Sequence, residues 1–124
     1  MELDEQTILE FVRGSLKSAW SLELLLLLRR VPIQAWNVDG LVRELRGSVS
    51  SVTESLEALN SAGLIEITEA GEYRYSARTP ALEAMVAGLV ELYSHKPITV
   101  LRAIFSSPTD KIRSFSDAFL IKKK

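Results

Sequence analysis

Residues 37–65 read NVDGLVRELRGSVSSVTESLEALNSAGLI, and this stretch decides the fold that the sequence predicts. In its second half, apolar residues recur at helical spacing, so one face of a helix is apolar. These residues are Val49, Val52, Leu56 and Leu59. Gly63 follows the last of them, where a residue of left-handed conformation commonly ends a helix. The spacing therefore predicts a helix over residues 48–62.

The first half of the stretch predicts a shorter helix. Its apolar positions are Leu41, Val42 and Leu45. Asn37 or Asp39 would cap its start, and Gly47 would close it. Two helices of this size joined by Gly47 and Ser48 are typical of a helix-turn-helix.

A β-hairpin is predicted directly after the second helix. Residues 65–67 and 73–75 are β-prone and alternate in character, and residues 69–72 between them suit a short hairpin loop. Residues 33–36 could add a short third strand, anchored by Trp36.

This order of elements resembles the winged helix-turn-helix domain over residues 18–79, most closely that of the MarR and ArsR types of bacterial transcriptional regulators. In that family the second helix often ends in a pattern like Leu-x-x-Leu-x-x-x-Gly-Leu-Ile. The matching residues here are Leu56, Leu59, Gly63, Leu64 and Ile65. The pattern reports how a helix packs on a hairpin and leaves open what the outer face of the helix contacts.

Helices are also predicted on both sides of this region. Residues 3–12 form an amphipathic pattern, which we expect to pack on the C-terminal part of the chain or on a second subunit. Residues 18–30 contain the leucine run 24–28, which leaves almost no polar face and therefore predicts the central core helix. Val31 and Pro32 end that helix.

A strong helical stripe follows Thr79, which would cap the helix, and Pro80, which would be its first residue. Its members are Leu82, Met85, Val86, Leu89, Val90 and Tyr93. Small residues beside it would let another helix approach closely: Ala81, Ala84, Ala87 and Gly88. Either the stripe closes the protein's own core or, as the resemblance implies, the helix forms a dimer interface.

Two shorter amphipathic helices are predicted beyond residue 95. The apolar residues of the first are Ile98, Leu101, Ile104 and Phe105. The second begins at Ser107 and Pro108, carries Ile112, Phe115 and Phe119 on one face, and precedes three terminal lysines.

The sequence thus predicts a mainly α fold with a small β-hairpin. We expect an N-terminal helix in residues 1–16, a winged helix-turn-helix domain in residues 17–79, and a C-terminal helical extension in residues 80–124 as the candidate dimerisation region.

Composition narrows the classes of function. The 124 residues are 47% hydrophobic, enough for a core, and the absence of cysteine excludes disulfides, thiol catalysis and cysteine-bound metals. The longest apolar run is far shorter than the roughly 20 residues that span a bilayer, and the N-terminus is acidic where a secretory signal would be basic. We therefore expect a cytoplasmic protein.

Charge is divided unevenly along the chain. Residues 1–95 hold 8 Lys/Arg against 14 Asp/Glu, whereas residues 96–124 hold 7 against 2. Such a division suits either a basic tail that binds an acidic partner or a tail that docks on its own acidic body.

No arrangement typical of catalysis is present. The single histidine, His95, stands at a predicted helix end, and no phosphate-binding loop, nucleophile elbow or metalloprotease motif occurs. We expect no enzyme activity, no cofactor and no metal.

The resemblance implies that the second helix of the motif enters the major groove of double-stranded DNA. The residues then expected to face DNA from this helix are Ser48, Ser50, Ser51, Thr53, Glu54 and Ser55. Phosphate contacts would come from Arg43, Arg46, Arg74 and Arg78. However, residues 48–62 contain no Lys or Arg and two glutamates, which weakens attraction to phosphate. Two hypotheses follow: a homodimeric DNA-binding transcriptional regulator, or a winged-helix protein-interaction module.

Overall fold

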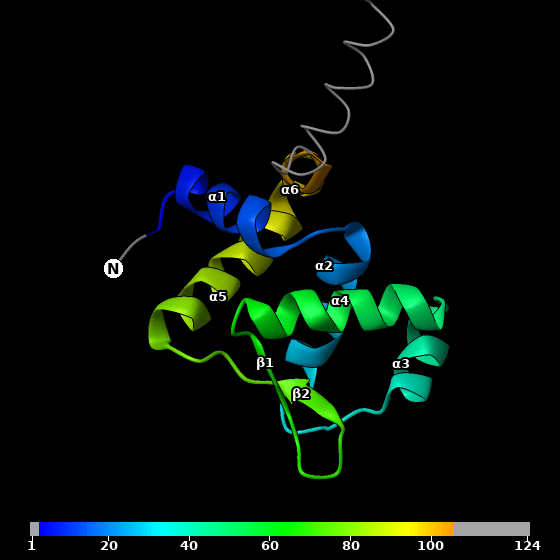
Figure 1. Ribbon diagram of the computed structural model, residues 1–124. Helices are drawn as coiled ribbons and strands as arrows, with labels where there is room; N and C mark the ends of the chain where they lie inside the picture. Colours follow the sequence, from blue (N-terminus) through cyan, green and yellow to red (C-terminus); the bar gives the residue numbers. More distant parts are fainter. Residues whose placement is uncertain (1–2, 106–124) are drawn as a thin grey trace, which may run out of the picture.

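The computed structural model describes residues 3–105 and has a mainly helical fold with one small antiparallel sheet (Figure 1). The described helices are α1 (Glu5–Ser15), α2 (Ala19–Arg30), α3 (Val38–Leu45), α4 (Val49–Ser61), α5 (Pro80–His95) and α6 (Pro97–Phe105). The strands are β1 (Ile65–Ile67) and β2 (Tyr73–Tyr75). The predicted helix after Ser107 and the lysine cluster at residues 122–124 lie outside the described residues.

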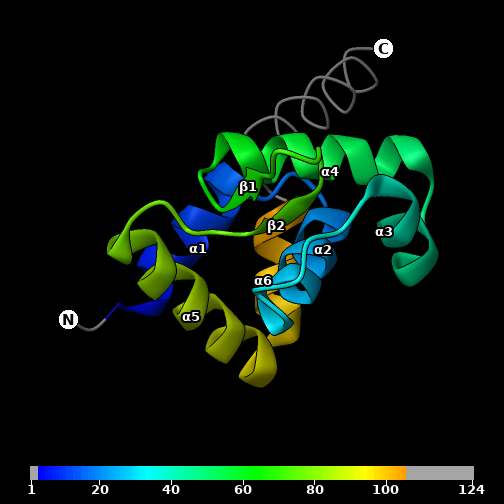
Figure 2. The same ribbon diagram turned by 90° about the horizontal axis from the view of Figure 1, so that it is seen from below.

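Helix α2 lies at the centre of the molecule, as the leucine run predicts. Ser18 caps its first turn by accepting a hydrogen bond from the backbone N–H of Ser21 at 3.2 Å. Leucines around most of its circumference are buried: Leu22, Leu24, Leu25, Leu27 and Leu28. Figures 1 and 2 both show α3 on one side of α2 and α5 on the other. One continuous apolar core therefore joins the helix pair of α3 and α4 to the outer helices α1, α5 and α6.

Helices α3 and α4 form the predicted pair, with one difference at the turn. Asn37 is the cap of α3 and accepts a hydrogen bond from Gly40 N–H at 2.7 Å, whereas Asp39 lies within the first turn. The left-handed residue that closes α3 is Arg46 (φ 56°), and not Gly47 as expected. Gly47 instead allows close packing, because a Cβ at this position would lie 3.2 Å from the ring of Trp20.

The hairpin follows α4, and its two strands cover the predicted residues. Gly63 (φ +80°) ends the helix, and Glu66 of β1 pairs with Arg74 of β2. The expected third strand is reduced to one bridge, in which Trp36 and Tyr73 exchange two backbone hydrogen bonds of 2.8 Å. Residues 33–35 form no ladder with the sheet. The side chain of Ile33 is 85% exposed, so no apolar packing holds this residue against the sheet.

The outer helices α1, α5 and α6 pack against one another, which places the N-terminal helix on the C-terminal part of the chain. The stripe on α5 contributes to the protein's own core, with Val86 and Leu89 fully buried. A Cβ on Gly88 would lie 2.9 Å from Ile8 Cδ1, so the helix that approaches α5 closely at this point is α1.

The buried face of α6 differs from the expected one. Ile98 and Phe105 are 60% and 63% exposed, whereas Val100 and Ala103 are buried with Ile104. These three buried residues follow the i, i+3, i+4 spacing and face α1 and α5, the helices that α6 packs against. The apolar pattern alone did not identify which of two overlapping stripes would be covered.

A polar cluster ties α5 to α2 and the hairpin. Arg29 forms an ion pair of 2.9 Å with Glu83, which also accepts a 2.5 Å hydrogen bond from the hydroxyl of Tyr75. The Tyr75 hydroxyl and then the Arg29 guanidinium hold the pKa of Glu83 below its ordinary value of 4.5. Burial, followed by the neighbouring Glu83, raises the pKa of Tyr75 to about 12, so its hydroxyl remains a donor at neutral pH.

Replacement of Gly63 by alanine should destabilise the fold more than the same change at Gly71. Both glycines have φ +80°, so each alanine costs about 1–2 kcal/mol of backbone strain. At Gly63 the new Cβ would also lie 3.2 Å from Arg78 Cδ and 3.3 Å from Leu82 Cδ1, whereas nothing lies within 4 Å at Gly71. Urea denaturation of both variants measures the difference; equal losses of stability would contradict the packing at Gly63.

Glu83→Gln should lower the free energy of unfolding by about 1 kcal/mol at pH 7, because the charged hydrogen bonds of a half-exposed group are lost. A carboxyl group whose pKa is lower in the folded state than in the unfolded state stabilises the native state at pH values above its unfolded-state pKa. This contribution is lost as the pH falls through its folded-state pKa. The difference from wild type should therefore shrink as the pH falls below 4.5 and vanish below the folded-state pKa of Glu83. Denaturation from pH 7 to pH 2 measures it.

Glu91→Gln is the matched control for that experiment, since Glu91 lies on the same helix, is exposed, and contacts only His95 as an ion-pair partner among the described residues. We expect its stability to change by less than about 0.5 kcal/mol. A pH-independent loss in Glu83→Gln would show that its carboxylate charge does not contribute.

Candidate functional site

The N-terminal turn of α4 presents a group of hydroxyls at the surface. Ser48 caps the helix, accepting a hydrogen bond from Ser51 N–H at 3.1 Å, and its own hydroxyl donates to Ser51 Oγ at 3.0 Å. Ser48, Ser50 and Thr53 are exposed, as is Glu54. The expected outward position of these four residues is confirmed, whereas Ser51, which was also expected to face outward, is half-buried.

Ser55 does not belong to this surface. It was expected to face outward, but its exposed fraction is 3%, and it lies on the buried side of α4 with Val52, Leu56 and Leu59. The reason is geometric, because α4 packs most extensively against α2. The buried stripe on α4 is wide and includes position 55. A serine is small enough to be accommodated there.

Arg43 and Arg46 lie at the C-terminal end of α3, immediately before the turn that leads to Ser48. Both are exposed, and neither side chain forms a hydrogen bond or ion pair with the residues that the structure describes. Their guanidinium groups are therefore available to an external anion. The left-handed conformation of Arg46 sets it at the corner of the two helices.

The two arginines of the hairpin region are engaged within the protein. Arg74 forms an ion pair with Glu66 on the opposite strand, in the cross-strand position that the register dictates. Arg78 donates a 3.2 Å hydrogen bond to the carbonyl of Asn60 at the end of α4. All four arginines were expected to contact phosphate, but only the side chains of Arg43 and Arg46 have no bonding partner among the described residues, whereas Arg74 and Arg78 are bonded within the protein.

Acidic side chains surround the helix pair. Glu54 and Glu57 are exposed on α4, and Glu69 is exposed in the hairpin loop. The two glutamates of α4 line a cavity of about 330 Å³ together with Lys17 from the link between α1 and α2. Lys17 brings a cation to this side of α4, and no local sequence signal indicated it, because the proximity depends on how α1 packs.

Apolar side chains also reach this surface. Val49 is 58% exposed at the start of α4, and Ile67 is 53% exposed on β1. A small cavity between α4 and the hairpin is lined by Ile67, Tyr73 and Thr53, among others. The surface is therefore mixed in character and suits a macromolecular partner better than a small polar ligand.

The remaining chemistry of the described residues is sparse. No three metal-binding side chains gather among residues 3–105, and none of the helices there has the length and apolar character needed to cross a membrane. His95 is exposed at the end of α5, where its ring contacts Glu91.

No protein-family model, curated protein or solved structure matches this chain.

Ser48→Ala should destabilise the protein by about 1 kcal/mol, because α4 loses its capping acceptor for the Ser51 N–H. Ser50→Ala is the matched control: its hydroxyl lies one position into the exposed turn and caps no backbone group. We expect the control to remain within about 0.5 kcal/mol of wild type. Thermal denaturation compares the two, and equal stabilities would contradict the role of Ser48 as the cap.

Proposed function

We propose that residues 17–79 form a winged helix-turn-helix domain that binds double-stranded DNA as a transcriptional regulator. The order α2, α3, α4, β1, β2 supports this, as does the backbone bridge between Trp36 and Tyr73, which occupies the position of a third strand. The hairpin loop projects away from the body beside the helix pair (Figure 1).

One observation carries the DNA-binding proposal: Arg43 and Arg46 are exposed and unbonded next to the hydroxyl-bearing first turn of α4. Arginine forms strong charge-assisted hydrogen bonds with phosphate, and serine hydroxyls donate to phosphate or to base edges. In this arrangement, Arg43 and Arg46 hold the DNA backbone while Ser48, Ser50 and Thr53 approach the groove.

A homodimer is part of this proposal. Ala81, Ala84 and Ala87 are exposed on α5 and keep one side of that helix free of bulk. A second copy packed there would place two helix-turn-helix units in one particle. The number of available arginines at the proposed interface would then double, which compensates for the lack of cations on α4 itself.

A second candidate function is supported by a different observation. Arg74 is neutralised by Glu66, Arg78 is bonded to Asn60, and exposed Glu54 and Glu69 add negative charge to the same region. This balance of charge, with Val49 exposed among polar neighbours, favours a protein partner over DNA. The alternative is therefore a winged-helix protein-interaction module.

The double variant Arg43→Gln/Arg46→Gln should weaken binding to random-sequence duplex DNA at low salt. Each phosphate contact contributes about 0.9 to the slope of log K against log salt concentration, so the slope should fall by about 2 per chain. Fluorescence anisotropy across a salt series measures affinity and slope, and sedimentation of the complex gives the number of chains per duplex.

The matched control is Arg13→Gln/Arg102→Gln, which removes the same charge from α1 and α6, outside the helix pair of α3 and α4. We expect it to alter DNA affinity by less than about threefold, as remote charges are screened. Wild-type protein that fails to bind duplex DNA even at low salt would overturn the DNA-binding proposal and favour the protein-interaction module.

A further inference from the structure

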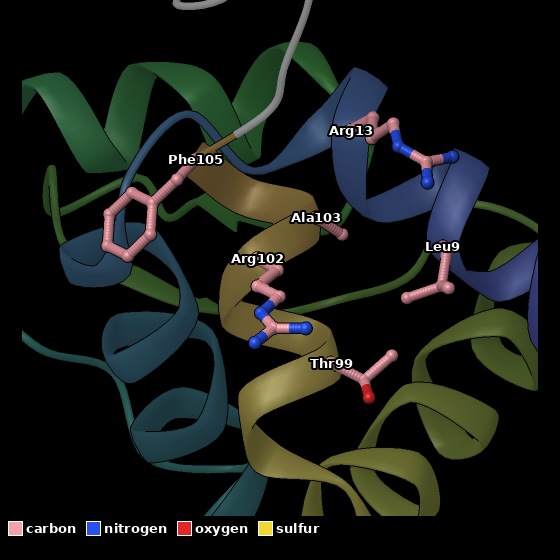
Figure 3. A pocket seen from close by; sticks show the side chains of 6 residues that line it. All are labelled: Leu9, Arg13, Thr99, Arg102, Ala103 and Phe105. Atoms are coloured by element: carbon pink, nitrogen blue, oxygen red, sulfur yellow. The ribbon is translucent and has the colours of Figure 1, made fainter.

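A groove of about 500 Å³ lies between α1 and α6, on different elements from the proposed DNA-binding surface. Its lining residues are Leu9, Arg13, Thr99, Arg102, Ala103 and Phe105 (Figure 3). The volume falls within the roughly 300–1,000 Å³ that small-molecule sites usually occupy. Leu9 and Ala103 are 7% and 3% exposed, so the groove has an apolar floor that forms part of the core.

Two cations flank this apolar floor. Arg13 follows Leu9 by one turn of α1, and Arg102 follows Thr99 by one turn of α6. Figure 3 shows both arginine side chains on the same open side of the groove, one from each helix. Neither forms a hydrogen bond or ion pair with the described part of the chain.

The carboxylates of α1 lie outside the lining of the groove. Glu5 is held by Lys96 at 2.9 Å, Glu10 is exposed on the same helix, and none of the described residues that line the groove is acidic. The two guanidinium groups carry like charge, and an anion bound between them would offset their mutual repulsion. The Thr99 hydroxyl supplies a further donor at the same site.

We propose that this groove binds an alkyl carboxylate. The hydrocarbon chain would cover Leu9 and Ala103, and the carboxylate would accept hydrogen bonds from Arg13 and Arg102. Charge-assisted bonds from arginine to a carboxylate are short and can be bidentate, which fixes the orientation of the head group. The groove is formed by the side chains of two helices and has no glycine-rich loop, so it lacks the backbone N–H cradle common in phosphate sites.

Isothermal titration calorimetry with octanoate tests the proposal on the full chain at pH 7. We expect saturable binding of one octanoate per chain and at least tenfold weaker binding of 1-octanol, which has the same chain length without the charge. Amide chemical shifts in NMR spectra should move for Leu9, Thr99 and Ala103. Octanol binding as tight as octanoate binding, or no octanoate binding, would overturn the proposal.

Arg13→Gln/Arg102→Gln should weaken octanoate binding at least tenfold, with an unchanged circular dichroism spectrum because both side chains are free of bonds to described residues. Arg43→Gln/Arg46→Gln is the matched control and should bind octanoate within about twofold of wild type, since remote charges are screened. An equal effect of both double variants would show non-specific attraction and overturn the site. Because the two pairs exchange roles in the DNA and octanoate experiments, failure of one proposal is distinguishable from failure of the other.

Discussion

Burial of the leucines of α2 is the constraint on which the rest of the structure depends. Removing side chains of this kind from water contributes about 1.5–3 kcal/mol each, so a helix with leucine around most of its circumference must be covered on several sides. Helix α4 covers one side most extensively, and β2 and α3 cover others. The other elements are arranged by this requirement.

The same constraint determines which side of α4 remains available to a partner. Because Val52, Leu56 and Leu59 must face the core, the turn that begins at Ser48 is directed outward. Ser55 is drawn into the covered stripe, although its residue type resembles that of the exposed serines. Packing, and not polarity, therefore sets the limits of the proposed interface.

Pairing of charges then distinguishes one part of the surface from another. Glu83 serves both Arg29 and Tyr75, Glu66 holds Arg74, and Glu5 holds Lys96. Two pairs of arginines have no such partner among the described residues: Arg43 with Arg46, and Arg13 with Arg102. The first pair borders hydroxyls at a helix corner, whereas the second borders an apolar groove. This difference in surroundings is the physical basis for assigning a polyanion to one pair and an amphipathic anion to the other.

Sequence by itself determined the elements, because their signals are local. The cap Thr79 and the stop at Gly63 each act within one turn of the backbone, and their predicted roles are confirmed, as is Asn37, one of the two predicted caps of α3. Exposure of the first turn of α4 was also predictable, since the apolar spacing fixes the opposite face.

Tertiary structure alone decided the features that depend on long-range proximity. Which stripe of α6 is buried, whether Ser55 is covered, and whether Arg74 or Arg43 is bonded all depend on the relative placement of elements that are distant in sequence. The groove with Arg13 and Arg102 unites residues almost ninety positions apart, and neither helix carries a local signal of the other. Local physics selects a helix or a strand, whereas only packing selects its neighbours.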